Sequence, residues 1–195
     1  MNLPNTLTTS RFFMAGLMMF FLFSGLPWGA TLALLVFGLA ALTDALDGKL
    51  ARSKYGVTSF GALLDPLADK VLVCAAFVSF VQLRWIPAWV VVLILSREFL
   101  VTGLRVLAAS QNRNISAGAW GKHKTIWQIV AIVALLIGRA VEQDVLPRFA
   151  PDVTANVSAQ LPALAYAIAL VAAVITVASG FIYFYQHRDL LAEHM

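Results

Sequence analysis

The chain has 195 residues, of which 61% are hydrophobic and 12% charged, and its mean hydropathy is +0.83. Soluble domains carry about 45–50% apolar and about 25% charged residues, so the composition excludes a soluble globular protein and predicts an integral membrane protein. The net charge of +4 gives no reason to expect a nucleic-acid partner, and the single cysteine, Cys74, excludes an intramolecular disulfide.

Six apolar segments are expected to cross the bilayer as helices. They span residues 12–27, 31–50, 61–83, 87–109, 124–141 and 161–185. The polar stretch MNLPNTLTTSR before the first segment predicts a short N-terminal helix at the membrane interface. Residues 142–160 form the longest polar stretch between segments and are expected to be a loop. The expected fold is an all-α integral membrane protein: one domain over residues 1–195, with six transmembrane helices and the short interfacial helix.

The basic residues in the loops and at the ends of the apolar segments fall mainly on alternate sides. One set would lie on one side of the membrane: Arg11, Lys49, Arg52, Lys54, Arg113, Lys122, Lys124 and Arg188. The other side would carry only Arg84, Arg139 and Arg148. Because lysine and arginine favour the cytoplasmic side, both termini are expected in the cytoplasm, with the protein in the cell membrane.

Four aspartates stand out at the junction of the second and third segments. Asp44 and Asp47 are three residues apart, and Asp65 and Asp69 are four apart, so each pair shares a face of its helix. The intervening RSKYGVTSFG predicts an antiparallel hairpin that brings the pairs together. An ionised carboxylate in the bilayer is unfavourable by about 2.5 kcal/mol or more, so the group requires compensating cations. All-oxygen ligands favour two Mg²⁺ or Mn²⁺ ions, as in two-metal phosphoryl displacement.

The alternative is that the four carboxylates act separately, by reaching the interface or by pairing with nearby basic residues. The candidate basic partners are Lys49, Arg52 and Lys70. Small residues favour the shared site, because Gly48, Ala51 and Gly61 allow a ligand or another backbone to approach closely.

The spacing of these residues resembles the signature of the CDP-alcohol phosphatidyltransferases. From Asp44 to Asp69 the chain reads D-x2-D-G-x2-A-R-x8-G-x3-D-x3-D. The resemblance implies a six-span, homodimeric enzyme that uses CDP-diacylglycerol. It implies that Asp44, Asp47 and Asp65 hold one metal ion, and that Asp44, Asp65 and Asp69 hold the other. Asp69 would also be the catalytic base, and the donor-binding positions would be Gly48, Ala51, Arg52 and Thr58.

The acceptor alcohol is indicated by basic residues outside the signature. Arg97 and Arg105 are eight residues apart, close to one face of the fourth segment, and Lys122 and Lys124 stand where the fifth begins. A cationic pocket suits an acceptor that carries a phosphate, and we expect Arg105, Lys122 and Lys124 to bind it. The alternative for the two lysines is ordinary cytoplasmic positive charge. Arg97 lies mid-segment beside Glu98 and requires a polar partner.

The flanking stretches SREFLVTGLR, WGKHKT and NLPNTLTTSR resemble the branch of the family that uses sn-glycerol 3-phosphate. That branch would produce phosphatidylglycerophosphate and release CMP. A cardiolipin synthase, or another family enzyme with a different acceptor, is the first alternative, because the catalytic signature is shared. A divalent-cation transporter fits less well, because the far halves of the two aspartate-bearing segments read LALLVF and LVCAAFV.

Overall fold

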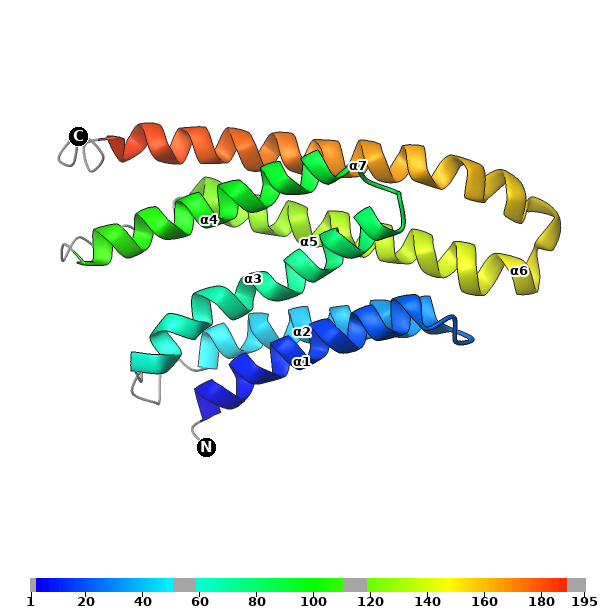
Figure 1. Ribbon diagram of the computed structural model, residues 1–195, viewed down its shortest axis with the longest axis horizontal. Coiled ribbons are helices and arrows are strands. Elements are labelled where there is room, and N and C mark those ends of the chain that lie inside the picture. Colours follow the sequence, from blue (N-terminus) through cyan, green and yellow to red (C-terminus); the bar gives the residue numbers. More distant parts are fainter. Residues whose placement is uncertain (1–2, 51–58, 111–118, 189–195) are drawn as a thin grey trace.

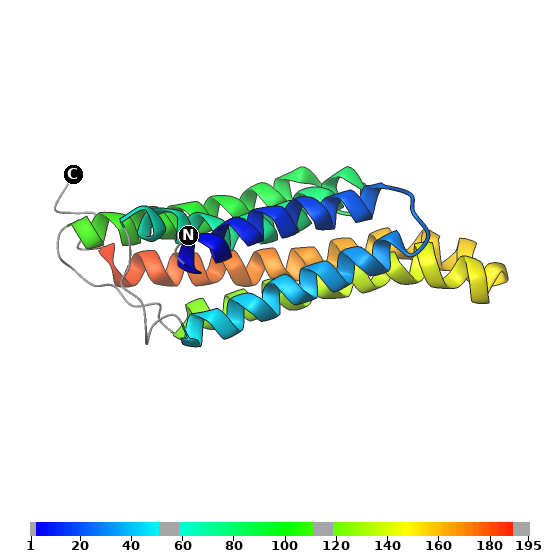
Figure 2. The same ribbon diagram turned by 90° about the horizontal axis from the view of Figure 1, so that it is seen from below.

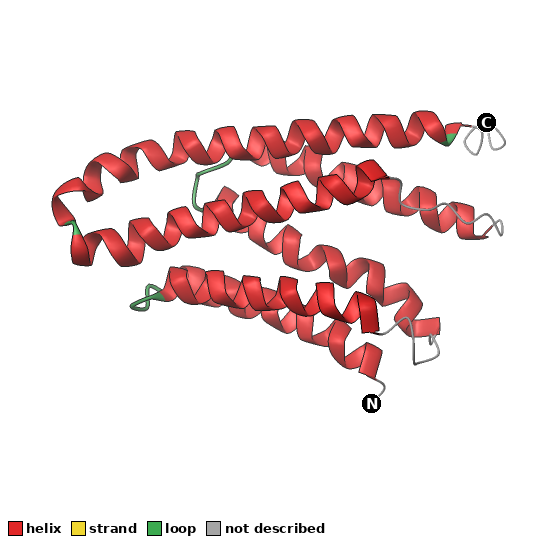
Figure 3. Cartoon of the chain, turned by 180° about the vertical axis from the view of Figure 1, so that it is seen from behind, coloured by secondary structure: helices red, strands yellow, loops and turns green. Residues whose placement is uncertain are grey.

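The computed structural model describes residues 3–50, 59–110 and 119–188, and their side chains over 10–43, 70–109 and 124–188. Every regular element in these ranges is helical (Figure 3). The elements are α1 (Leu3–Phe23), α2 (Gly29–Leu50), α3 (Ser59–Gln82), α4 (Ala88–Ser110), α5 (Ala119–Ala140), the π-helical turn η2 (Val141–Val145), α6 (Leu146–Phe149) and α7 (Pro151–Gln186). The long helices α1 to α5 and α7 correspond in order to the predicted segments.

The long helices run alternately back and forth in an elongated bundle (Figures 1 and 2). Helix α1 packs against both α2 and α3, which contact each other much less than each contacts α1. Helix α5 packs against α2 and α7, and α4 packs against α7 and α3. Helices α2 and α3 run in opposite directions, as the sequence predicts (Figure 1). The main packing partner of both helices is nevertheless α1.

The two ends of the bundle differ in what they contain. The described chain begins and ends at one end, where α2 and α4 also finish and α3 and α5 begin (Figure 1). The opposite end holds the α1–α2 and α3–α4 turns together with η2 and α6. We call these the terminal end and the turn end. The signature aspartates belong to the terminal end, because they lie where α2 finishes and α3 begins.

The buried residues of α2 and α3 include large aromatic side chains, whereas those of α7 are mostly small. Aromatic side chains such as Phe37 of α2 and Phe77 and Phe80 of α3 are fully buried, in a cluster to which α1, α4, α5 and α7 also contribute. Helix α7 instead buries a row of mostly small residues: Ala165, Ala169, Ala172, Ala173, Thr176, Ser179, Gly180 and Tyr183. Small side chains let neighbouring helices approach closely, so the backbone of α7 can lie near the long polar side chains of α4 and α5.

Two local predictions are wrong. Helix α1 runs without a break from Leu3 to Phe23, so the predicted short interfacial helix is not a separate element. Residues 142–160 are not an extended loop, because η2, α6 and the first turns of α7 make most of this stretch helical. Proline at the first positions of α6 and α7 starts both helices, and Arg139 pairs with Glu142 three residues later at 2.6 Å. A polar composition marks exposure to water and does not by itself exclude a helix.

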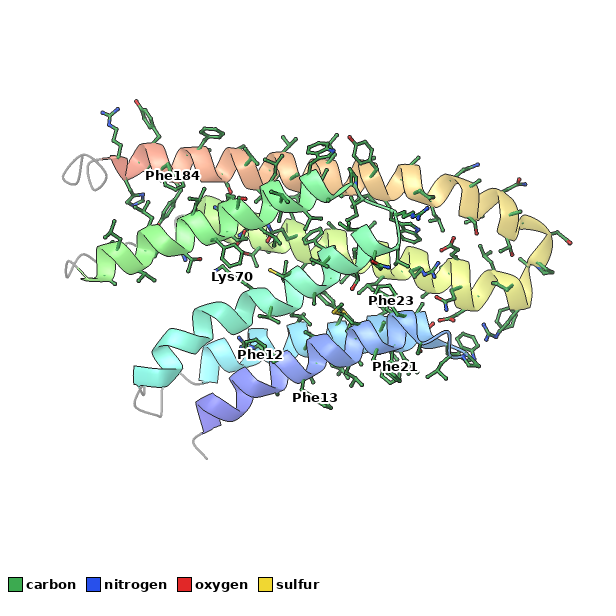
Figure 4. The ribbon with its side chains drawn as sticks, in the orientation of Figure 1. Phe12, Phe13, Phe21, Phe23, Lys70 and Phe184 are labelled. Carbon is green, nitrogen blue, oxygen red and sulfur yellow. The ribbon has the colours of Figure 1, made fainter. Side chains whose placement is uncertain are left out.

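By length and composition, α7 is the one helix of the described part that could cross a membrane, and shorter apolar runs cover Ser10–Phe23, Gly29–Thr43 and Lys70–Gln82. The outer surface carries many large apolar side chains. Phe13, for example, is 70% exposed and points away from the bundle (Figure 4). Soluble monomers rarely expose such extensive apolar surface, which agrees with the membrane protein expected from the composition.

Candidate active site

The aspartate signature lies across the end of α2 and the beginning of α3. Asp44 and Asp47 belong to the last two turns of α2, and Asp65 and Asp69 to the first three turns of α3. Their side chains lie outside the described residues. Among the side chains that are described, no group of three histidines, cysteines or acidic residues could hold a metal ion. The donor set itself, four carboxylates on two connected helices, is one that Mg²⁺ or Mn²⁺ prefers.

The predicted donor-binding residues also fall at this junction. Gly48 lies in the last turn of α2, at a position whose surroundings are not described. Ala51, Arg52 and Thr58 lie outside the described residues. Lys122 is in the first turn of α5, and its side chain is likewise outside the described part. The roles of these residues stay predictions.

A buried polar network is fully described between α4, α5 and α7, and Glu98 is at its centre. The Oε1 atom of Glu98 accepts a hydrogen bond from the Lys124 ammonium and one from Gln128 Nε2 at 3.2 Å. Arg97 Nη1 forms a longer ion pair with the same oxygen at 3.5 Å. Lys124 is only 4% exposed and Arg97 8%. One carboxylate oxygen therefore compensates two buried cations.

Helix α7 holds the other side of this network. Arg97 Nη2 donates to Ser179 Oγ at 3.0 Å, and Ser179 Oγ donates to the backbone oxygen of Thr176 at 2.9 Å. Gln128 Nε2 also donates to Thr176 Oγ1 at 3.2 Å. A Cβ atom at Gly180 would stand 2.7 Å from Arg97 Cγ, so the absence of a side chain there makes room for the arginine. The expectation that Arg97 requires polar partners is confirmed.

Arg105 is held separately, one helical turn further along α7. Its Nε atom donates to the Tyr183 hydroxyl at 3.3 Å, and its guanidinium lies 5.5 Å from the centre of the Tyr183 ring. The tyrosine is buried and packs against the His187 ring, with centroids 4.5 Å apart. Arg97 and Arg105 both contact α7, so they share a face of α4, as their spacing predicts.

The signature helix passes close to this network. Lys70 directly follows Asp69 in α3, and in Figure 4 it lies between α3 and α4. Helix α3 contacts both α4 and α5, the helices that carry Arg97 and Lys124. The structure thus brings Arg97, Lys124 and the end of the aspartate signature into one region. A shallow apolar groove between α4 and α7, lined by Phe99, Leu100 and Phe184 among others, holds none of the predicted site residues.

Comparison with known proteins agrees with the signature. The sequence profile described as CDP-alcohol phosphatidyltransferase matches residues 1–185. The chain belongs to the CDP-alcohol phosphatidyltransferase family. The resemblance carried by the signature from Asp44 to Asp69 is therefore confirmed, and the chain is a phosphatidyltransferase.

Relatives of this phosphatidyltransferase carry one recurrent name, CDP-diacylglycerol–glycerol-3-phosphate 3-phosphatidyltransferase. The protein of that name from Bacillus subtilis is 43% identical over 148 residues, covering 70% of this chain and 77% of the relative. The one from Cereibacter sphaeroides is 39% identical, covering 72% of this chain and 66% of the relative. The one from Rickettsia bellii is 37% identical, covering 70% and 76%.

Sequence reasoning missed the neutral partners of the cationic residues. Gln128, Thr176, Ser179 and Tyr183 all contact the network or Arg105. A signal for three of them exists, because Thr176, Ser179 and Tyr183 recur at three- and four-residue spacing within an otherwise apolar segment. Such spacing places polar groups on one helix face, but it does not tell which helix that face contacts.

Proposed function

We propose that this phosphatidyltransferase transfers the phosphatidyl group of CDP-diacylglycerol to sn-glycerol 3-phosphate, producing phosphatidylglycerophosphate and CMP. The observation that carries the proposal is a group of three cations beside the signature helix. Arg97 and Lys124 belong to the Glu98 network, and Arg105 is held separately by Tyr183 of α7. A phosphate on the acceptor gives these cations a partner of the correct charge. The names of the relatives support the same acceptor.

Two divalent cations, Mg²⁺ or Mn²⁺, would be held by Asp44, Asp47, Asp65 and Asp69. When bound, they would neutralise the diphosphate and stabilise the charge that develops on its oxygens. Asp69 takes the proton of the acceptor hydroxyl, whose oxygen forms a bond to the lipid-side phosphorus. The bond between that phosphorus and the oxygen of CMP breaks, and CMP leaves.

The remaining residues bind and orient the two substrates. Gly48, Ala51, Arg52 and Thr58 contact the CDP part of the donor, where Arg52 offers a planar set of donors to phosphate oxygens. Arg105, Lys122 and Lys124 bind the acceptor phosphate. An ammonium has three N–H donors, so the contact of Lys124 with Glu98 leaves donors for a phosphate.

We further propose that α1 to α5 and α7 all cross the cell membrane, that the terminal end is cytoplasmic, and that the protein is a homodimer. The alternating charges and the common location of the described chain ends support this orientation. Single cysteines test it. A cysteine at Asn114, between α4 and α5, should react with an impermeant thiol reagent only from the cytoplasm. A cysteine at Asn156 in α7 should react only from outside, and the Cys74→Ser chain is the background. The reversed pattern contradicts the orientation.

An acceptor comparison tests the reaction. Purified protein with CDP-diacylglycerol and Mg²⁺ or Mn²⁺ is given glycerol 3-phosphate, glycerol or phosphatidylglycerol, and CMP release and lipid products are measured. We expect phosphatidylglycerophosphate from glycerol 3-phosphate and little product from the other two. Efficient conversion of phosphatidylglycerol to cardiolipin would assign the chain to the alternative branch. Comparable use of glycerol would mean that the cationic network does not select the acceptor.

A further inference from the structure

Glu98 is the partly buried acidic side chain at the centre of the network, and the reaction above gives it no role. We propose that Glu98 is a positioning residue of the acceptor site. It does not contact the acceptor, but it fixes the Lys124 ammonium and the Arg97 guanidinium. The preference for a phosphorylated acceptor then depends on Glu98. This inference rests on the proposed function, because it takes Lys124 as a ligand of the acceptor phosphate.

The first argument is electrostatic. Lys124 and Arg97 are both more than nine-tenths buried, and both carry positive charge. Two like charges withdrawn from water repel each other and lose hydration, and an adjacent anion relieves both penalties. Among the described side chains, Glu98 is the acidic group in contact with them. Without its charge, the two cations would have to separate or admit water.

The second argument concerns geometry. Glu98 is itself held in place, because Gln128 Nε2 lies 3.2 Å from both Glu98 Oε1 and Thr176 Oγ1 and so links the carboxylate to α7. The guanidinium of Arg97 is held from the opposite side by Ser179. A lysine side chain loses much rotational freedom when it is fixed, and binding is tighter when that ordering is already complete before the ligand arrives.

The third argument is an internal contrast with Arg105. Its partner among the described side chains is Tyr183 on α7, whereas Glu98 pairs with Lys124 and Arg97. Loss of the Glu98 charge should therefore disturb Lys124 and Arg97 but leave Arg105 in position. A site with one cation still fixed should bind the acceptor phosphate more weakly while keeping a measurable turnover.

The test is Glu98→Gln. Glutamine keeps the shape of the side chain and one oxygen that can accept a hydrogen bond, but it removes the negative charge. We expect the KM for glycerol 3-phosphate to rise about tenfold or more, with kcat changed by less than about threefold and the KM for CDP-diacylglycerol unchanged, as expected for lost ground-state binding. The preference for glycerol 3-phosphate over glycerol should fall by a similar factor. Calorimetric binding of glycerol 3-phosphate to metal-free protein should weaken in parallel, which separates the effect from turnover.

Glu142→Gln is the matched control. It removes the same kind of charge from an ion pair with Arg139 at the turn end, where the pair distance is 2.6 Å. Its acceptor KM should equal that of the wild type. Glu98→Asp keeps the charge on a shorter side chain, and it should recover part of the acceptor preference that Glu98→Gln loses.

A double variant tests whether Glu98 acts through Lys124. In the Lys124→Ala background, Glu98→Gln should raise the acceptor KM much less than it does in the wild type, because coupled residues are not additive. The double variant lacks the Lys124 charge that Glu98→Gln leaves without a partner. If Glu98→Gln alone does not fold, the double variant can therefore be compared with Lys124→Ala. Full additivity of the two changes contradicts the proposal.

The outcomes separate this inference from the proposed function. A folded Glu98→Gln protein with an unchanged or lower acceptor KM overturns the positioning role, because the carboxylate would then only repel the phosphate. A wild-type protein that does not prefer glycerol 3-phosphate over glycerol overturns the proposed acceptor instead, whatever Glu98→Gln does.

Discussion

Two carboxylates inside the bundle, the partly buried Glu98 of α4 and the buried Asp144 of η2, are stabilised in different ways. Glu98 is paired with Lys124 and Arg97 and accepts a hydrogen bond from Gln128. Asp144, only 1% exposed, accepts hydrogen bonds at 2.8 Å from the backbone N–H and the hydroxyl of Thr31. Glu98 therefore relies on side-chain cations, whereas Asp144 relies on neutral donors near the beginning of α2.

The difference follows from helix geometry. The first N–H groups of a helix have no partner within the helix, and the positive end of the helix dipole favours an anion. Thr31 is the third residue of α2, so Asp144 satisfies such a group and needs no lysine. Arg148 adds support by donating to the Asp144 backbone oxygen at 2.5 Å and by lying over the Trp28 ring at 4.8 Å.

The consequence is a difference in charge available to a ligand. Arg97, Lys124 and Arg105 carry three positive charges against the single negative charge of Glu98, which leaves a surplus of two among these described side chains. At the turn end, Arg139 is matched by Glu142, and Arg148 lies near Asp144. We infer that the cations around Glu98 and Tyr183 can receive an anion, whereas the charged groups at the turn end hold helices together.

The largest expected effect comes from the signature itself. Asp47→Asn removes one charged metal ligand with little change in volume, so the protein should still fold and insert. Phosphotransfer should fall by about two orders of magnitude or more, since charge stabilisation dominates such reactions. CMP release measured beside a thermal unfolding curve checks both points. Near-normal turnover would contradict the metal assignment of the terminal end.

A smaller effect is expected from the cations of the acceptor site. Lys124→Ala or Arg105→Ala should raise the KM for glycerol 3-phosphate by roughly 10–150-fold, because a hydrogen bond to a charged group contributes about 1.5–3 kcal/mol. The kcat and the KM for CDP-diacylglycerol should change little. Arg148→Ala, which removes a cation from the turn end, is the control and should leave the acceptor KM unchanged. Equal effects at the two ends would remove the contrast between them.

The third prediction concerns the carboxylate at the turn end. Asp144→Ala leaves the two partly buried Thr31 donors without their partner, so the free energy of unfolding should fall by about 3 kcal/mol. Turnover per folded molecule should be unchanged, because no substrate is expected at this end. Thermal unfolding in detergent gives the stability, and Asp152→Ala at an exposed position of α7 is the control. A specific loss of kcat with intact stability would give this end a part in catalysis.

The smallest effects are expected from two helical glycines. Gly180→Ala places a Cβ 2.7 Å from Arg97 Cγ, and overpacking of this kind is unfavourable by about 1–3 kcal/mol. It should also weaken acceptor preference, because it moves Arg97 without removing a charge. Gly103→Ala on α4 has nothing within 4 Å, so it should stabilise its helix by up to about 1 kcal/mol. Equal stability of the two variants would show that Gly180 is not the spacer for Arg97.

The sequence alone determined the helical elements and the family. Apolar segments of sufficient length predicted all six long helices, because the length and apolar character of a segment depend only on consecutive residues. The aspartate signature predicted the family, and the eight-residue spacing of Arg97 and Arg105 predicted a shared helix face, because helical periodicity is a local property. Composition could not tell that α1 is continuous from Leu3 to Phe23 or that residues 142–160 are mostly helical.

The tertiary structure decided which polar groups meet. Lys124 pairs with Glu98 across 26 positions, Ser179 meets Arg97 across 82, and Thr31 meets Asp144 across 113. Each contact requires two particular helix faces to pack together with the two residues at the same level along the bundle. Hydrophobic periodicity predicts which face of a helix is buried, but it does not predict which helix packs against that face. Small residues on α7 let α4 and α5 approach closely, so Arg97 and Gln128 reach Ser179 and Thr176. The contact between Thr31 and Asp144 instead joins the beginning of α2 to η2.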